Sequence, residues 1–344
     1  MRKIYVLLGF QFLFNSFLMS YQKPKEFTIK NDVNRNLNLS EIATSLEMII
    51  LDSPAKGKIE DISEFILTSE FIFTLTRLRI ESKDFTRVLQ FNKKGGFIQQ
   101  VGEDFKGGRN LVHNPTKEAI GISDGKEVVF YNYDGLRTGV AKAFAVRQVY
   151  FNDLFWGVSS IYSSNQWQYT LKKSDVNGVK FEEIFKFSDP DRNIIGPQVS
   201  LSIRKGRLYF WEMYKKSFYE VRGNEVIEKF KLSSSPKIGF HSNAQIKGDW
   251  IVVSGINQIR RKQFLKLINI KSEVQYSVPY HAREASGILD DISGAGFLNV
   301  FPSGPVYGEV ANKLFFVEKK KDVPSLSDSQ YPEDSLVIFI ATLK

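Results

Sequence analysis

The feature that most constrains the fold is a repeat of apolar run, polar turn and apolar run. It recurs five times, starting at residues 91, 131, 171, 219 and 268, so that successive starts lie 40, 40, 48 and 49 residues apart. Each turn places Gly, Asn, Asp or Ser between two apolar runs, which is the chemistry of a tight reversal between antiparallel strands. A period of this length made of strands indicates a repeated sheet unit rather than a helical repeat.

Further apolar runs lie between these repeats, and most contain a turn of their own. They cover residues 63–75, 119–130, 148–156, 198–210 and 243–253. Each unit therefore holds about four short strands, the content of one propeller blade. Aromatic residues make up 14% of the chain and suit strands. We predict an all-β, six-bladed β-propeller of four-stranded antiparallel blades. Seven blades is the alternative, because the 71 residues between Ile268 and Phe339 leave room for a miscounted blade.

A propeller ring must also close, since unpaired first and last edges are an aggregation hazard. We expect Glu26–Ile29 or Met48–Leu51 to add a strand to the final blade. Helix signals are few, and the strongest, in Ser40–Leu46, predicts one or two turns before that strand.

Residues 1–20 have the pattern of an export signal. Arg2 and Lys3 precede an apolar run, Ile4–Phe14, and the small residue Ser20 marks a cut. The run is shorter than the roughly 20 apolar residues that cross a bilayer. We expect cleavage to leave residues 21–344 as a single propeller domain, periplasmic or secreted, without stable membrane insertion.

Composition narrows the classes of partner. Hydrophobic residues are 42% and charged residues 25%, as in ordinary globular proteins. The net charge of +9 is spread over short runs with no continuous basic stripe, which disfavours nucleic acid. The chain has no cysteine, which excludes disulfides, thiolate metal sites and lipid attachment through cysteine.

Several segments resemble the six-bladed, TolB-like β-propellers exported by Bacteroidetes, many of them lipoproteins of uncharacterised function. They are LSEIATSLEMIILDS (39–53), IEDISEFILTSEFIFTL (59–75), VLQFNKKGGFIQQVG (88–102), GILDDISGAGFLNVFP (287–302) and EDSLVIFIATLK (333–344). The resemblance implies the fold and says little about activity. The chain departs from the family in two places. Residues 102–114 replace the Gly-Pro-rich connector of the relatives, and the signal lacks the cysteine that lipoprotein relatives acylate. Membrane tethering is therefore not implied.

The three histidines, His113, His241 and His281, each follow the last strand of one unit, where blade connectors approach the central channel. Three imidazoles could hold zinc with an open position for an activated water. This is the basis of an alternative function, an extracytoplasmic metal-dependent hydrolase or lyase with a His-lined channel site. The simpler interpretation is solvated loop histidines.

Other candidate residues have a functional and a structural interpretation. Asp290 and Asp291 could bind calcium, although a turn with Asx hydrogen bonds is favoured. Trp211 and Tyr214 could lie at a rim and stack on sugar rings, although most aromatic residues should pack between blades. Arg109 follows two glycines without the context of a phosphate loop, and we keep it as a candidate ligand contact.

We therefore expect an exported, monomeric, non-catalytic binding propeller without a cofactor. Its connector loops and channel face would bind a glycan, peptide or protein. The candidate ligand-binding residues are Trp211, Tyr214, Arg109, Asp290 and Asp291, and the alternatives with a cofactor are zinc at the three histidines or calcium at the two aspartates.

Overall fold

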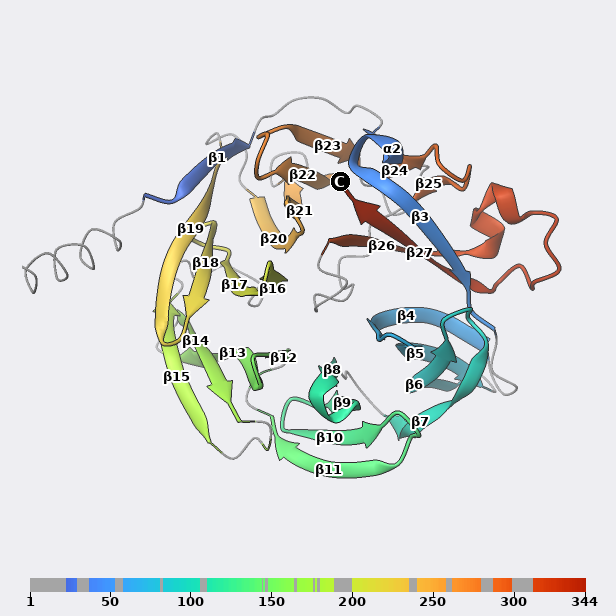
Figure 1. The fold of residues 1–344 in the computed structure, drawn as a ribbon, viewed down its shortest axis with the longest axis horizontal. Helices are drawn as coiled ribbons and strands as arrows, with labels where there is room; N and C mark the ends of the chain where they lie inside the picture. Colours follow the sequence, from blue (N-terminus) through green and yellow to red (C-terminus); the bar gives the residue numbers. More distant parts are fainter. Residues whose placement is uncertain are drawn as a thin grey trace, which may run out of the picture.

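In the computed structural model of this chain, seven β-sheets stand around a common axis like the blades of a propeller (Figure 1). The structure describes residues 23–29, 37–52, 58–80, 83–105, 110–143, 145, 148–163, 166–175, 177, 180–188, 200–234, 240–257, 262–279, 287–298 and 312–344. The statements below concern these residues. The export signal predicted for residues 1–20 lies outside them.

Blades 1 to 5 are four-stranded antiparallel sheets, each made from consecutive strands. They are β4 to β7 (Lys58–Leu67, Phe71–Ile80, Lys83–Asn92, Phe97–Phe105), β8 to β11 (Asn110–Asn114, Ala119–Ser123, Glu127–Asn132, Arg137–Lys142), β12 to β15 (Gln148–Phe151, Leu154–Ser163, Gln166–Ser174, Phe181–Ser188), β16 to β19 (Ser200–Arg204, Arg207–Glu212, Ser217–Arg222, Glu225–Ser234) and β20 to β23 (Phe240–Lys247, Trp250–Asn257, Lys262–Asn269, Gln275–Pro279). The five repeated turns of the sequence are the reversals between the third and fourth strands of these blades. The strand content predicted for each unit is confirmed here.

Blades 6 and 7 each take a strand from the N-terminal part of the chain. Blade 6 joins β24 (Ile288–Asp290) and β25 (Gly296–Leu298) to β2 (Leu37–Asn38), and blade 7 joins β26 (Lys313–Lys319) and β27 (Leu336–Leu343) to β3 (Ala43–Ile50). The prediction of six blades is wrong, and the alternative of seven is confirmed. The miscount arose because β24 and β25 are three residues long and resemble a loop in sequence.

The closing strand is β3, which pairs antiparallel with β27 along its whole length, as expected for Met48–Leu51. β1 (Lys25–Ile29) does not join the final blade but pairs parallel with the outer strand of blade 4, β19. A single helical turn, α2 (Leu39–Ile42), separates β2 from β3, so the expected helix is shorter than Ser40–Leu46. We call β1, β2, α2 and β3 together the N-terminal strap.

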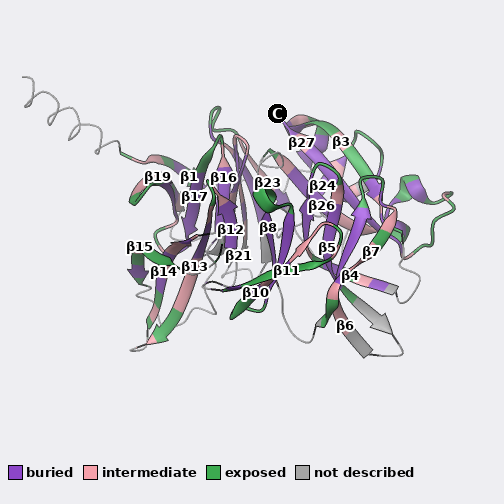
Figure 2. Ribbon diagram, turned by 60° about the horizontal axis from the view of Figure 1, so that its bottom comes forward, coloured by how far each residue is buried: buried purple, intermediate pink, exposed green. Residues whose placement is uncertain are grey.

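The core lies between the blades. Buried residues form six clusters, and most fill the space between two neighbouring sheets, as with Trp156 and Leu171 of blade 3 against Phe210 of blade 4. One larger cluster spans blades 5, 6 and 7 and includes Phe316 and Phe339. Figure 2 shows the resulting pattern: β27 is buried along its length, whereas β10 and β11 expose much of theirs.

The turns that join the first to the second strand and the third to the fourth strand of a blade lie on one edge of the ring, because successive strands are antiparallel. We call this the turn edge. Several of its turns have a left-handed backbone, as at Asn152, Asp153 and Lys205, which suits tight reversals between antiparallel strands. Short 3-10 turns occur at Pro115–Lys117, Lys320–Asp322 and Pro324–Leu326. Within the described residues, no helix is long and apolar enough to cross a membrane.

Candidate ligand-binding site

A hollow of about 360 Å³ opens on the turn edge between blades 3 and 4. Its wall on blade 3 comes from the β12–β13 turn and from β14, with Phe151, Leu154, Trp156 and Lys173. On the blade 4 side, the β16–β17 and β18–β19 turns border it. We call this feature the blade 3–4 hollow. Its volume lies at the lower end of the roughly 300–1,000 Å³ typical of ligand pockets.

Two glycines keep the blade 4 side of the hollow open. Gly206 and Gly223 have φ angles of 67° and 61°, and a Cβ added at either would meet no atom within 4 Å. The left-handed backbone of these tight turns favours glycine. The missing side chains leave space between the apolar wall of blade 3 and the charged residues that follow each turn on blade 4.

Those charged residues form a cluster around a buried carboxylate. Glu220 has a side chain only 2% exposed and accepts hydrogen bonds from Arg222 Nε at 2.6 Å and from Arg207 Nη1 at 3.3 Å. Burial alone would raise the pKa of Glu220, but the hydrogen bond from Arg222 and the charges of Arg222, Arg207 and Lys229 hold it below its usual range. Glu220 is therefore an anion at neutral pH.

Lys173 joins the two blades beside the hollow. Its Nζ, from β14, lies 2.7 Å from Asn224 Oδ1 in the β18–β19 turn and 2.9 Å from Glu182. It also sits 5.8 Å from the centre of the Trp156 ring, a cation–π distance. Trp156 Nε1 donates to the Phe151 carbonyl at 3.2 Å, so the indole is fixed in place.

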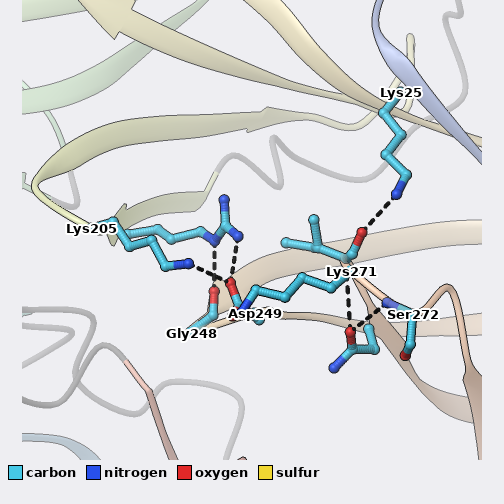
Figure 3. A network of polar contacts seen from close by, with 9 residues as sticks. Lys25, Lys205, Gly248, Asp249, Lys271 and Ser272 are labelled. Atoms are coloured by element: carbon cyan, nitrogen blue, oxygen red, sulfur yellow. Dashed lines mark hydrogen bonds and ion pairs between the residues drawn. The ribbon is translucent and has the colours of Figure 1, made fainter.

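A second ionic cluster continues along the turn edge to blade 5 (Figure 3). The Asp249 carboxylate meets Arg204 at 2.5 Å, Lys205 at 3.1 Å and Lys271 at 2.5 Å. Burial opposes its charge, but the hydrogen bonds from Lys271, Arg204 and Lys205 lower the pKa of Asp249 well below its usual range. Arg204 also donates to the Gly248 carbonyl, and Lys25 of the strap donates to the Ile270 carbonyl, both at 2.8 Å.

The aromatic residues predicted at a rim lie on the opposite edge of blade 4. Trp211 is fully buried between blades 4 and 5, with its ring 4.8 Å from Phe218. Tyr214 is half-buried in the β17–β18 turn, and its hydroxyl lies 3.3 Å from that of Tyr169 on blade 3. Trp211 thus packs between blades, whereas part of the Tyr214 side chain remains exposed to solvent.

Asp290 ends β24, Asp291 follows it, and both carboxylates accept hydrogen bonds from the chain itself. Asp290 is buried and accepts from the backbone N–H groups of Ile292, Ser293 and Ala295, each at 2.9 Å. Asp291 accepts from Ser40 N at 2.9 Å and Ser40 Oγ at 2.5 Å. The bonds to Asp290 are the turn bonds of the structural interpretation, whereas the bonds to Asp291 fasten the short blade 6 to the strap.

Of the histidines, His113 is buried in β8, and its Nε2 lies 2.9 Å from the Tyr133 hydroxyl. Burial lowers the pKa of His113 to about 4. The side chain of His241, together with His281 and Arg109, lies outside the described residues. Within the described part of the chain, no three His, Asp or Glu side chains gather as a metal site.

The structure therefore brings together residues that the sequence analysis did not select. Lys173, Arg207, Glu220 and Arg222 are not among the candidates named there. One sequence signal was available: the two turns of blade 4 are spelled RKGR (204–207) and VRGN (221–224), each with arginine beside a turn glycine. Their meeting beside Trp156 depends on how blades 3 and 4 pack.

No model of a known protein family matches the chain, and no curated protein matches it in sequence. A solved structure from Bacteroides fragilis, named as an exported protein, superposes with a TM-score of 0.64 over 94% of this chain and 100% of that one, at 13% identity. This similarity shows that the two chains share their fold. The seven sheets of this chain agree with the propeller implied by the resemblance stated above, but not with its six blades.

Two other structures match more loosely. They are TolB from Acinetobacter baumannii, with a TM-score of 0.43 at 8% identity over 94% of this chain and 96% of that one, and an oligogalacturonate lyase from Vibrio parahaemolyticus, with 0.45 at 12% over 87% and 96%. The chain is thus a seven-bladed β-propeller that shares its fold with an exported bacterial protein.

Proposed function

We propose that this chain is an exported, non-catalytic binding propeller, and that the blade 3–4 hollow is its ligand site. The observation that carries the proposal is the hollow itself. It combines an apolar wall with exposed cations on a rigid edge, which is the composition of a binding pocket with a few orienting polar groups.

The absence of catalysis is argued from the chemistry of the same residues. The described residues lining the hollow include no histidine, serine or aspartate. Their carboxyl group, Glu220, has a lowered pKa and is paired with two arginines, so it is a poor proton donor at neutral pH. The described hollow thus has groups that hold a ligand but no paired nucleophile and base.

The pattern of the N-terminal residues supports export. The basic, apolar and small-residue pattern of residues 1–20 ends before β1 begins at Lys25. Cleavage near Ser20 would therefore leave the strap intact. The fold shared with an exported protein of Bacteroides fragilis is consistent with this location.

The test is a binding screen with the mature chain on a printed array of oligosaccharides and peptides. Gly223→Asn places a side chain in the hollow while keeping a residue that tolerates the left-handed backbone. Gly125→Asn is the matched control, because Gly125 has a φ of 85°, equally open surroundings and a place in blade 2. We expect bound ligands to be lost from the first variant, kept by the second and recovered chemically unchanged. The proposal is overturned if Gly223→Asn binds the ligands as the unmodified chain does, or if the ligands are chemically converted.

A further inference from the structure

At the turn edge of blades 4 and 5, largely buried carboxylates are surrounded by a larger number of cationic side chains. Two carboxylates, Glu220 and Asp249, are surrounded by six cations: Arg207, Arg222 and Lys229 at the first, and Arg204, Lys205 and Lys271 at the second. Three neighbouring charged residues extend this count: Lys173, its partner Glu182, and Glu225, which lies opposite Arg222. With them included, cationic side chains still outnumber anionic ones.

Both carboxylates are largely buried, and four of the six cations around them reach solvent. Side-chain exposure is 2% for Glu220 and 14% for Asp249, against 55% for Arg207, 48% for Arg222, 60% for Lys205 and 69% for Lys271, while Arg204 at 13% and Lys229 at 21% lie deeper. The pair of Lys173 and Glu182 has the opposite order, at 17% and 48%. An anion that approaches Glu220 or Asp249 from solvent therefore meets positive charge first. Exposed charges of one sign beside a hollow raise the local concentration of ligands of the opposite sign.

The guanidinium groups have donors to offer. Arg207 meets Glu220 only through Nη1 among the described contacts, at 3.3 and 3.5 Å, which is long for an ionic hydrogen bond. A guanidinium carries five N–H donors in a planar fork that fits a carboxylate or a sulfate with two parallel bonds. Arg207 is therefore suited to bind a ligand acid group.

The opposite wall is small, and it has apolar side chains beside Asn152 and Lys173. Phe151 and Leu154 are half-buried there, and Trp156 is buried behind them. Flat apolar faces of sugar rings pack on such side chains, and a hollow of about 360 Å³, at the lower end of the size range of ligand pockets, would hold only part of an oligosaccharide. Most of the ligand would lie outside, along the basic turn edge.

We propose that the blade 3–4 hollow binds an acidic saccharide, with one ring against Phe151 and Leu154 and the acid groups along the arginines and lysines of blades 4 and 5. This inference rests on the proposed function and adds the class of ligand. A peptide that binds by strand addition needs an open sheet edge. At blade 4 that edge is already covered, because β1 pairs with β19.

The experiment titrates the mature chain by calorimetry with four probes: an oligouronate, the same oligouronate fully methyl-esterified, a sulfated oligosaccharide and a glutamate-rich peptide. We expect one acidic saccharide to bind at least about tenfold more tightly than the neutral ester, and binding to weaken with salt. The uronate and sulfate arms separate the two sources of acid group.

Arg207→Gln removes one exposed cation from the hollow and should weaken binding about tenfold. Arg137→Gln is its control, since Arg137 is an exposed arginine on β11 of blade 2 and the change in net charge is the same. Thermal unfolding of both variants checks that they fold. The inference is overturned by equal affinity for the neutral ester, by tighter binding of the peptide, by an unchanged Arg207→Gln, or by no saccharide binding up to about 1 mM. Binding of a neutral sugar that depends on Gly223 would overturn this inference and leave the binding function standing.

Discussion

Blades 6 and 7 and the edge shared by blades 3 and 4 are built in opposite ways. Blades 6 and 7 are completed by strands from the N-terminal strap, and many of their buried residues belong to one cluster that runs from blade 5 to blade 7. Other buried residues of blade 7 pack against blade 1. Blades 3 and 4 each have four consecutive strands of their own, and β1 of the strap is added only outside β19. The two blades share a buried cluster and leave a hollow bordered by charge at the turn edge. Ring closure thus depends on apolar burial, while the turn edge of a finished blade is free to carry binding groups.

The largest contrast should appear when the same side chain is truncated in the two regions. Phe339 is fully buried in β27, so Phe339→Ala should lower the free energy of unfolding by about 3–5 kcal/mol. Phe181 on blade 3 is 36% exposed, and Phe181→Ala should cost less than about 1 kcal/mol. Urea unfolding followed by circular dichroism measures both. Similar losses would contradict the assignment of closure to blade 7.

The contact where the strap passes from blade 7 to blade 1 gives the next effect. A Cβ on Gly95 would lie 1.9 Å from the Ile50 carbonyl oxygen, and Asp52 N donates to the Gly95 carbonyl at 2.9 Å. Gly95→Ala must therefore displace the end of β3, and we expect a loss of about 2–4 kcal/mol. Gly125→Ala has open space and should cost only about 1 kcal/mol. Equal melting temperatures for the two variants would show that β3 is not held at this point.

These predictions also show what the sequence can and cannot reveal. The turns were predictable because Asn152-Asp153 and the glycines beside Lys205 and Arg222 satisfy a local backbone requirement that any fold would impose. The number of blades was not predictable, because Leu37–Asn38 becomes a strand only by pairing with Ile288–Asp290, 251 residues further along the chain, and the partner of Ile288–Asp290 on its other side, Gly296–Leu298, is three residues long. Tertiary pairing of such short segments leaves no periodic signal.

The candidate site was harder still. Trp211 and Asp290 are conspicuous in the sequence, yet the first packs between blades and the second bonds to its own loop. Arg207 and Arg222 belong to different hairpins, and they form one cluster only because both pair with Glu220. The two arginines reach the same buried carboxylate because of the register in which the strands of blade 4 pair. The sequence pattern does not specify that register.

A third prediction concerns pH on the closing side. Lys247, at the end of β20, is 4% exposed and lies 5.4 Å from the centre of the Phe315 ring of blade 7. Burial lowers the pKa of Lys247 from 10.5 to about 7. Between these values the unfolded chain binds a proton that the folded chain releases, so the free energy of unfolding rises with pH by about 1 kcal/mol per unit.

The rise should be missing in Lys247→Met, which keeps the length of the side chain without the charge. Denaturant titrations of both proteins from pH 7 to about 10 give the difference. Lys271→Met is the control, because Lys271 is 69% exposed and has no such burial. A parallel pH dependence in wild type and Lys247→Met would argue against a buried lysine in the closing region.

The smallest effect is expected at the hollow. The pKa of Glu220 is lowered, so its contribution to stability is complete above about pH 4.5 and is lost as the pH falls through the folded value. Because Arg207 and Arg222 are half exposed, Glu220→Gln should cost only about 1 kcal/mol at neutral pH. The same change frees two guanidinium groups and should tighten the binding of acidic saccharide, whereas Glu182→Gln on blade 3 should do less. Calorimetry that found weaker binding for Glu220→Gln would place the ligand elsewhere.

The most direct measurement is a crystal structure of the mature chain with a bound oligouronate or sulfated oligosaccharide. We predict seven blades, with one sugar ring against Phe151 and Leu154 and its acid group beside Arg207. A ligand located on the opposite edge near Tyr214, or along the central axis with the blade 3–4 hollow filled by protein, would contradict the account.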